Sequence, residues 1–502
     1  MFGEAAPAQQ PGRLAAVNIA SGVTMADSSK EIGAGRVSFL TGEQKQRIYD
    51  TALGILSDIG MVVLHEEGEQ VMLDGGCTRD AEGMIHVPAA LVEQARESAP
   101  ASFAVYDRAG EPAMDLGGRR SYFGNGSDVM HLIDLETGER RLGKMADVAE
   151  AARLCDALPE IDFVMSGAWP DGMDAGEAYP KQFRAMIPST TKPLVMTAGG
   201  VETVEPMWRM ACEVRGGEQA LRDKPYFIMY NQPVSPLKHP FETVDKLLFC
   251  ADKGVPSTYC PSPVAGGTAP ITTPGQITLG IAEALFGLVM HQLRAPGAPF
   301  VIGQGPNTLD MGTSQSSYNS PEFIRAYAME VEMAKWLDIP NWGFSGHTDA
   351  QVVDAQAGME ADEITKLSMQ LGANLNHDVG YMDFGLSGSL AEVVLVAEFI
   401  SRNRQLLKAI EVDDEELAVD VLKAVGPGGD YLGQRHTRKH LRQNQWRAKV
   451  LNRASHDRWL EGGGLDATQK ATQRAKELLL AHSVAPLSEG LAARLDAVVP
   501  AP

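Results

Sequence analysis

The sequence predicts a mixed α/β fold, a (β/α)8 TIM barrel with an N-terminal α/β extension and a C-terminal helical extension. Between about residues 121 and 411, eight short apolar runs that end in Gly, Asn, Ser or Pro alternate with helical segments. Such alternation is typical of a parallel barrel. A length of 502 residues exceeds one average domain but fits one barrel with extensions. An open, doubly wound sheet is the alternative, because the number of strands does not prove closure.

The strands of the barrel are predicted wherever a short apolar run precedes a turn. They span residues 122–124, 163–166, 194–197, 226–231, 257–260, 300–303, 341–345 and 373–377. Start and stop signals bound several helices. Ser320 and Asp354 can cap helices, Gly372 ends the second of these, and Thr273 precedes a nearly all-apolar helix that runs through Leu293.

Three further segments flank the barrel at residues 121–411. Residues 1–40 have no clear periodicity and are predicted to form a flexible or partner-bound arm. Residues 41–120 are predicted to form the α/β extension, with a helix that Thr41 caps and Gly60 ends. Residues 412–502 are predicted to be helical and to pack on the barrel exterior. Their basic section, 435–442, either docks an acidic partner or pairs with this chain's own acids.

Composition excludes several classes of protein. A net charge of −21, from 44 basic and 65 acidic residues, argues against a general nucleic-acid-binding surface. The sequence contains no run of about 18 apolar residues and no signal-peptide pattern, so we expect a cytoplasmic protein without a membrane span. The cysteines are odd in number and form no CxxC pair, which argues against a disulfide framework or a structural zinc site. They are Cys77, Cys155, Cys212, Cys250 and Cys260.

Parallel barrels carry their active sites at the carboxyl ends of the strands, and this rule selects the candidate residues. The loops there combine aromatic rings, acids and amides, and they contain few Lys or Arg residues apart from Lys238. Such a mouth suits a cationic ligand rather than a phosphate, because ring faces attract ammonium groups. We predict His347 and Asp349 as catalytic residues. The predicted substrate-binding residues are Tyr230, Asn231, Tyr259, Gln304, Phe344, Ser345, His377 and Tyr381.

Other readings of these residues stay open. His347 and Asp349 on one loop and His377 and Asp378 on the next could form a His and carboxylate metal site, but no HExxH pattern supports one, and we predict no metal. His347 could also be a loop histidine that bonds the backbone. Cys260 is expected to be a buried thiol rather than a nucleophile.

Stretches along most of the chain resemble the trimethylamine methyltransferase family, specifically its members without pyrrolysine. Each stretch is short, and their order and number make the match specific over about residues 45–480. They are Asp134-Leu-Glu-Thr-Gly-Glu-Arg-Arg141 with Asp147, Thr191-Lys192-Pro193, Tyr230–Leu237, Ser262-Pro263 with Ala265–Pro270, Asp354–Glu360, and Gly429–Gly433 with His436-Thr437.

The resemblance implies a (β/α)8 barrel that transfers a methyl group to the Co(I) corrinoid of a separate protein, with no tightly bound cofactor of its own. Archetypal members contain pyrrolysine and act on trimethylamine. This chain has only standard residues, so the resemblance suggests a quaternary N-methyl compound such as glycine betaine. Such a substrate already carries a neutral amine as its leaving group, and the enzyme's main task is alignment.

Two alternatives to this function remain, and neither nucleic acid nor membrane is an expected partner. One is a metal-dependent barrel lyase or hydrolase. The other is a non-catalytic betaine-binding protein that keeps the barrel. A homo-oligomer is compatible with the extensions, but the sequence does not determine the number of subunits.

Overall fold

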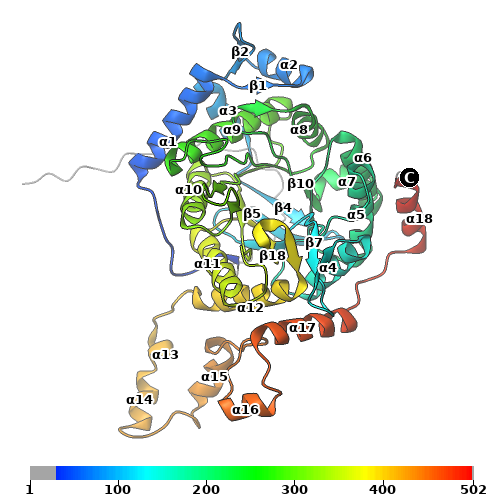
Figure 1. Ribbon diagram of the computed structural model, residues 1–502. Coiled ribbons are helices and arrows are strands. Elements are labelled where there is room, and N and C mark those ends of the chain that lie inside the picture. The colour runs from blue at the N-terminus through cyan, green and yellow to red at the C-terminus, as the bar shows by residue number, and fades with distance from the viewer. Residues whose placement is uncertain (1–29, 500–502) are drawn as a thin grey trace, which may run out of the picture.

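A computed structural model describes residues 30–499, in which helices surround a centre of short parallel strands (Figure 1). This confirms the predicted mixed α/β class. The central strands are β6 (Tyr122–Asn125), β9 (Leu194–Met196), β10 (Phe227–Met229), β12 (Ser257–Tyr259), β13 (Phe300–Ile302), β16 (Trp342–Phe344) and β17 (Leu375–Val379). The helices outside them are α4 (Met145–Ala157), α5 (Ala175–Ser189), α6 (Val201–Arg215), α7 (Glu218–Asp223), α8 (Phe241–Lys253), α9 (Thr273–Arg294), α10 (Pro321–Leu337), α11 (Ala355–Leu371) and α12 (Leu390–Leu406).

Parallel pairing runs from strand to strand around this centre. One sheet has the order β13-β12-β10-β9, and a second has the order β16-β17-β6. Single parallel bridges join the two sheets, from Ile302 to Asn341 on one side and through Phe163 and Val164 on the other. The pairings therefore return to β6, where they began. Seven of the eight predicted strands coincide with these strands, and the second is present only as its two bridges, Gly124 with Phe163 and Val164 with Leu194.

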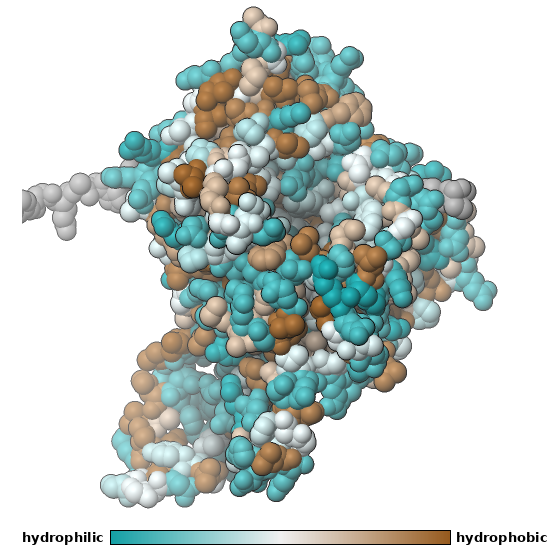
Figure 2. All heavy atoms as spheres, in the orientation of Figure 1, coloured by the Kyte–Doolittle hydropathy of each residue, from teal (hydrophilic) through white to brown (hydrophobic). Residues whose placement is uncertain are grey.

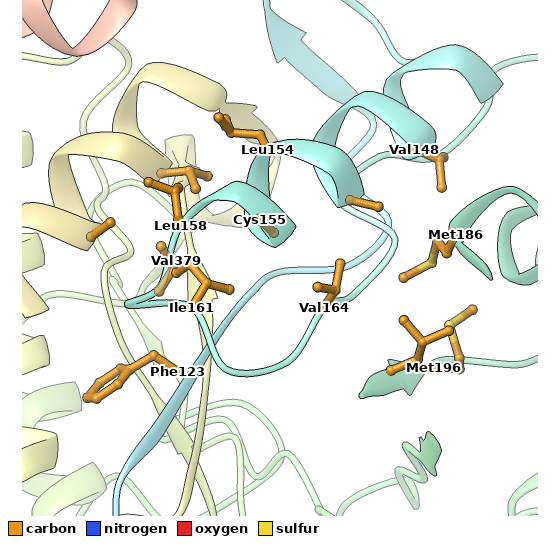
Figure 3. Close-up of a cluster of buried hydrophobic side chains, with 14 of the residues drawn as sticks. Phe123, Val148, Leu154, Cys155, Leu158, Ile161, Val164, Met186, Met196 and Val379 are labelled. Carbon is orange, nitrogen blue, oxygen red and sulfur yellow. The ribbon is translucent and has the colours of Figure 1, made fainter. Parts of the chain in front are cut away.

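Side chains along the central strands alternate between two packed layers, as the two-residue period of a strand requires. Tyr122 and Leu375 belong to a buried cluster in the middle of the ring. Their neighbour Phe123 belongs instead to the layer between strands and outer helices, where Figure 3 shows it in one cluster with α4 residues such as Leu154. Residue parity thus decides which side chains face the middle.

The hairpin of β4 (Ser102–Tyr106) and β5 (Pro112–Gly117) fills the amino-terminal end of the ring. Val105 and Met114 pack in the same buried cluster as Tyr122 and Leu375. Asn374, just before β17, joins this hairpin to the strands. Its side chain donates to Gly117 O and Arg120 O and accepts from Asn341 N, at N–O distances of 3.2, 2.8 and 3.0 Å.

The predicted helix boundaries follow the capping chemistry. Ser320 accepts a hydrogen bond from Phe323 N at the start of α10, and Asp354 accepts from Gln356 N at the start of α11. Gly372 ends α11 with φ +74°. The helix α1 (Gly42–Gly54) begins after Thr41 with a capping box and continues into the π-helical turn η2 (Ile55–Ile59). These signals were read correctly from the sequence.

The rest of the N-terminal region covers one side of the ring. It packs against α8 and α9, and its elements are β1 (Val62–Val63), α2 (Glu66–Asp74), β2 (Thr78–Arg79), β3 (Ile85–His86) and α3 (Ala89–Ser98). Residues 30–40 of the predicted arm lie on the chain's own surface, where Gly33 N donates to Leu407 O and Leu40 N to Glu332. Residues 1–29 of that arm lie outside the described residues. The domain boundaries themselves stay predictions.

Loops at the carboxyl ends of the strands form two small sheets. Their strands are β7 (His131–Ile133), β8 (Arg140–Leu142), β18 (Tyr381–Met382) and β19 (Ser387–Ser389) in one sheet, with the short helix η3 (Asp383–Gly385), and β14 (Thr308–Leu309) and β15 (Ser316–Ser317) in the other. The strand β11 (Lys238–His239) pairs with β1. The first sheet joins the loop after β6 to the loop after β17, so it bridges the mouth of the ring at one edge.

The C-terminal helices divide into two groups. In one, α17 (Ala467–Ala481) packs on α12 and α4, and α18 (Glu489–Val498) packs on α6, as predicted for the barrel exterior. The other group projects away from the ring (Figure 1). It comprises α13 (Asp414–Leu417), α14 (Val419–Val425), α15 (Arg435–Asn444) and α16 (His456–Glu461).

One helix of the described residues, α9, is long and apolar enough to cross a membrane by length and composition alone. It is the core helix of this fold, with 83 % of its most apolar stretch buried. Burial of Glu283 and His291 on the same helix fits a protein interior.

Replacing Asn374 by Ala should lower the free energy of unfolding by about 3 kcal/mol, because buried donors and acceptors on two sides of the ring lose their partner. Urea denaturation at constant pH measures this change. Asn444→Ala, at an exposed position on α15, is the matched control and should change the free energy by less than about 0.5 kcal/mol. Equal effects of the two substitutions would contradict the role given to Asn374.

Candidate active site

A cavity of about 300 Å³ lies at the carboxyl ends of the central strands. Figure 2 shows the molecule hollowed near the middle of the ring on the face toward the viewer. Because the hairpin β4–β5 fills the opposite end, the cavity opens only where the loops lie. It is lined by Ser127, Met165, Thr197, Tyr230, Gln232, Ser262, Gly305, Asn307, Tyr318, Trp342, Phe344, His377, Asp378 and Tyr381.

Aromatic side chains form much of the cavity wall. Trp342 is central: its ring lies 5.2 Å from that of Tyr230 and 4.2 Å from that of His377, between ring centroids. Phe344, two residues further along β16, lies 4.8 Å from His377. Strand parity directs these side chains inward together. The wall also includes Tyr318 and Tyr381.

The carboxyl group of Asp378 lies among the aromatic rings of the cavity wall. The residue is 2 % exposed, and among the described residues its Oδ1 has no hydrogen-bond partner. His377 Nε2 lies 3.1 Å from Oδ1, but the geometry of this contact does not make a hydrogen bond. Burial raises the pKa of Asp378 well above its ordinary value. The cavity therefore holds an acid that lacks a compensating cation.

The geometry of β17 explains why Asp378 faces the cavity. His377 and Asp378 are consecutive, so a regular strand would direct them to opposite faces. The pairing of β17 with β6 is irregular between Asn376 and Val379, and Asp378 has φ +75°. This irregularity turns the Asp378 side chain inward beside that of His377, as bulges next to active sites commonly do.

His377 is neutral in this setting. Its Nδ1 donates to Gly343 O at 2.8 Å, and burial lowers the pKa of the imidazole to about 3. None of the residues that line the described cavity is Lys or Arg. The ring of His377 thus contributes an aromatic face and a nitrogen lone pair rather than a positive charge.

Hydroxyl and amide groups form the rest of the wall. Ser262 Oγ donates to Gly305 O at 2.9 Å and accepts from Asn307 Nδ2 at 3.2 Å. Thr197 donates to a second carboxylate, Asp128, which lies behind the wall. Asp128 also accepts from Ser166 and Gln182. The wall is therefore polar where it is not aromatic.

Four of the predicted substrate-binding residues line the cavity: Tyr230, Phe344, His377 and Tyr381. The other four lie one residue out of phase and face the outer helices. Asn231 donates a hydrogen bond to Ser257 Oγ, and Ser345 Oγ shares one with Thr365 Oγ1. The hydroxyl oxygen of Tyr259 lies 2.6 Å from His239 Nδ1. Gln304 donates to Ile277 O on α9. The structure does not bring these four into the cavity.

The predicted catalytic residues lie behind the wall. His347 is fully buried, accepts from Asn319 Nδ2 at Nδ1, and packs edge-on against Tyr318 and Phe344. Burial lowers its pKa to about 3. Asp349 accepts hydrogen bonds from Ser317 Oγ and from the backbone N–H of Tyr318 and Asn319. Both residues hold the loop that carries Tyr318.

Sequence reasoning missed three important wall residues. Trp342 and Tyr318 were not selected, and Asp378 was considered at the end of the eighth predicted strand and as a metal ligand but was not chosen as a substrate-binding residue. Parity along residues 342, 344 and 345 would have separated Trp342 from Ser345, because the two must face opposite sides. Nothing in the sequence signals the irregularity that turns Asp378 inward. Among residues 30–499, no group of three or more His, Cys, Asp or Glu side chains could hold a metal ion.

The chain matches a known family over nearly its whole length. The family described as "Trimethylamine methyltransferase (MTTB)" matches residues 11–500. A trimethylamine methyltransferase, MttB, of Desulfitobacterium hafniense (strain DSM 10664 / DCB-2) is 30% identical over 468 residues, covering 93% of this chain and 94% of that protein. A glycine betaine methyltransferase of Desulfitobacterium hafniense (strain Y51) is 26% identical and covers 92% and 97% of the two chains.

A solved structure has a similar fold. The monomethylamine methyltransferase MtmB of Methanosarcina barkeri superposes with a TM-score of 0.51 at 10% sequence identity, over 90% of each chain. At that identity the likeness concerns the fold alone. The family match and the first relative together establish that the chain belongs to the trimethylamine methyltransferase family and is a methyltransferase.

Proposed function

We propose that this protein transfers a methyl group from a small quaternary amine to a corrinoid carried by a partner protein, and that its ring of strands is a closed (β/α)8 barrel. The observation that carries the substrate proposal is the Asp378 carboxyl group, unpartnered at Oδ1 and surrounded by aromatic rings. The continuous parallel pairing around the ring supports the barrel. Family membership supports the transfer and the corrinoid partner.

A quaternary ammonium group suits this cavity in both charge and shape. It cannot donate a hydrogen bond, so it needs an opposite charge and ring faces rather than directed acceptors. Asp378 supplies the charge, and a carboxylate about 4 Å from a cation contributes roughly 4 kcal/mol at an effective dielectric constant of about 20. Tyr230, Trp342, Phe344 and Tyr381 supply ring surface, each contact contributing roughly 0.5–2 kcal/mol.

Methyl transfer from a quaternary amine requires the protein mainly to align the N–CH3 bond that breaks. One N–CH3 bond breaks, its electron pair stays on nitrogen, and the product is a neutral tertiary amine, so no proton is needed. A reduced corrinoid supplies the nucleophile that accepts the methyl group. The residues of this chain bind the cation, exclude water and direct one methyl toward the mouth. Positive charge on nitrogen disperses as the bond breaks, so Asp378 must not bind the ground state too tightly.

The residues predicted from the sequence take distinct roles in this proposal. Tyr230, Phe344, His377 and Tyr381 bind substrate. His347 and Asp349 act from behind the wall as positioning residues, because they hold Tyr318 and support Phe344. The free thiols of all five cysteines are compatible with a cytoplasmic location, which we propose with the function.

Exposed apolar side chains around the mouth support a protein partner. Five exposed apolar side chains each lie on a loop that follows a different central strand. Such a ring of apolar groups favours contact with another protein. They are Val234 (50 % exposed), Ile271 (68 %), Met311 (60 %), Val352 (61 %) and Leu386 (48 %). We propose that the corrinoid protein docks on this rim, which brings its cofactor over the cavity.

Replacing Asp378 by Asn, which keeps the volume but removes the charge, should weaken quaternary-amine binding about 50-fold. Calorimetric titration with tetramethylammonium and glycine betaine measures the affinity, and methyl transfer to cob(I)alamin across a panel of quaternary amines measures activity. Asp457→Asn on α16, where the side chain is 94 % exposed, makes the same chemical change far from the cavity and should have no effect. Unchanged affinity in Asp378→Asn would refute the cation site.

Affinity for the quaternary amine should rise with pH. Burial raises the pKa of Asp378, so the acid is protonated at low pH and gains the charge that attracts the cation only as the pH passes that raised value. Below the pKa of Asp378, the affinity for the quaternary amine should rise by up to about tenfold with each pH unit. The pKa of His377 is about 3, and burial raises those of Tyr230 and Tyr381, so none of these gains charge near neutrality.

The same raised pKa has a consequence for the ligand-free protein. Because the folded state holds the proton more tightly than the unfolded state, the free energy of unfolding should fall as the pH rises through the folded-state value. Titrations across pH with wild type and Asp378→Asn test both statements. The slope of the affinity with pH should be lost in Asp378→Asn, and a slope that persists there would assign the titration to another group. The slope of the free energy of unfolding should only become smaller, because burial also raises the pKa of Glu283 to about 7 and that of Glu392 to about 8.

Replacing Met311 by Asp should lower the rate of methyl transfer to a corrinoid carrier protein at least tenfold, because a charge then faces the docking rim. Transfer to free cob(I)alamin should stay within about twofold, since the cavity is unchanged. Leu480→Asp, 88 % exposed on α17, is the control. Parallel loss with both acceptors would place the effect in the cavity rather than on the rim.

A further inference from the structure

Four of the six hydroxyl groups that line the cavity donate their hydrogen to an acceptor in the wall itself. The pairs are Thr197 with Asp128, Tyr230 with Gln232 Oε1, Ser262 with Gly305 O, and Tyr381 with Ser127 O. A hydroxyl group has one hydrogen and two lone pairs, so each of the four can offer the cavity only an acceptor. His377 adds another, because its Nδ1 carries the donated hydrogen and its Nε2 a lone pair. The wall therefore suits a ligand that brings its own hydrogen.

Donors are scarce in the same wall. Within residues 30–499, no Lys or Arg lines the cavity, and the amide of Gln232 is exposed to solvent. Trp342 Nε1 is buried and has no hydrogen-bond partner there, whereas Asn307 Nδ2 already donates to Ser262. An ionised carboxylate has about four lone-pair sites, and one free indole N–H satisfies only a small part of them. The wall therefore disfavours a substrate that carries a carboxylate, because a buried charge without partners is costly.

The carboxylate of Asp128 fixes the hydroxyl group of Thr197. Its Oδ2 accepts from Thr197, and its Oδ1 accepts from Ser166 Oγ at 2.7 Å and from Gln182 Nε2 at 3.1 Å. Because Ser166 and Gln182 satisfy one oxygen, the other stays directed at Thr197. The hydrogen of Thr197 is therefore held away from the cavity, and a lone pair of Oγ1 is left for a ligand.

Tyr381 joins the part of the wall that carries Thr197 to the part that carries Asp378. It follows Asp378 by three residues, and its hydroxyl donates to the backbone oxygen of Ser127, next to Asp128. Thr197 and Asp378 line the same cavity of about 300 Å³. A small molecule with a cationic nitrogen beside Asp378 and a hydroxyl group a short chain away can therefore reach both.

We propose that the preferred substrate is a quaternary ammonium compound with a neutral hydroxyl group on one N-substituent and no carboxylate, and that Thr197 recognises this hydroxyl group. The inference rests on the proposed function and specifies its substrate class. The substrate hydroxyl donates to Thr197 Oγ1 while the cation lies among the aromatic rings beside Asp378. Asp128 does not touch the substrate and acts as a positioning residue, because it holds the hydrogen of Thr197.

The methyl transfer stays balanced with such a substrate. One N–CH3 bond breaks, the methyl group passes to the reduced corrinoid without the bonding electron pair, and that pair stays on nitrogen. From choline, the simplest compound of this class, the product is 2-(dimethylamino)ethanol, which is neutral as it forms. The substrate hydroxyl keeps its proton throughout, so Thr197 contributes recognition and takes no proton.

A comparison of choline, glycine betaine and tetramethylammonium tests the proposal on the full chain. Methyl transfer to cob(I)alamin measures kcat/KM, and calorimetric titration measures affinity without turnover. Wild type should favour choline over glycine betaine by about tenfold or more in both. Thr197→Val, which keeps the shape but lacks the hydroxyl, should lower both values for choline about tenfold and leave those for tetramethylammonium within about twofold. Thr197→Ser should restore choline to within about threefold of wild type.

Two further variants complete the design. Gln232→Arg places a guanidinium group in the cavity lining and should raise glycine betaine relative to choline about tenfold, because it supplies the cation and the donors that a carboxylate needs. Thr51→Val, at an exposed position on α1, and Gln443→Arg, at an exposed position on α15, make the same chemical changes away from the cavity. Neither control should alter the ratio between the substrates.

Several outcomes would count against the inference. Equal affinity of wild type for choline and glycine betaine would overturn it, as would an equal loss of choline and tetramethylammonium in Thr197→Val. Demethylation of glycine betaine and tetramethylammonium but not of choline would overturn it and leave the proposed function intact. If no compound loses a methyl group but the titrations keep the preference for choline, the proposed function is contradicted and the recognition by Thr197 is supported.

Discussion

The two-residue period of the central strands controls the arrangement of the whole site. One set of alternate side chains fills the ring and lines the cavity, and the other set packs against the outer helices. Tyr230 faces the cavity while Asn231 bonds Ser257, and Phe344 faces it while Ser345 bonds Thr365. At one position, Asp378, the period is broken, and that break introduces the acid on which the proposed cation recognition depends.

Much of the architecture was predictable, because it rests on local signals. Caps at Thr41, Ser320 and Asp354 bound helices where the sequence indicates them, and seven predicted strands coincide with observed ones. The site was predicted less well. Choosing residues by their nearness to strand ends ignores parity, and so Tyr259 and Gln304 were included although they face α9. Asp378 depends on backbone pairing between distant strands, which no local pattern encodes.

The distribution of exposed apolar groups separates two kinds of contact. Those around the mouth lie on single loops and are spaced around an opening, which suits a partner that docks and leaves. Those of residues 408–445 follow one another along α13, α14 and α15, where no residue is buried. The first pattern is the one that the proposed contact with a carrier needs.

The hairpin β4–β5 also determines the order of events. Since it fills the amino-terminal end of the ring, amine and methyl acceptor share a single entrance. In the proposed cycle, the amine must enter before the carrier covers that entrance, and the demethylated amine can leave only after the carrier departs. Kinetics should therefore be compulsory-ordered, with excess carrier acting as an inhibitor that traps empty enzyme.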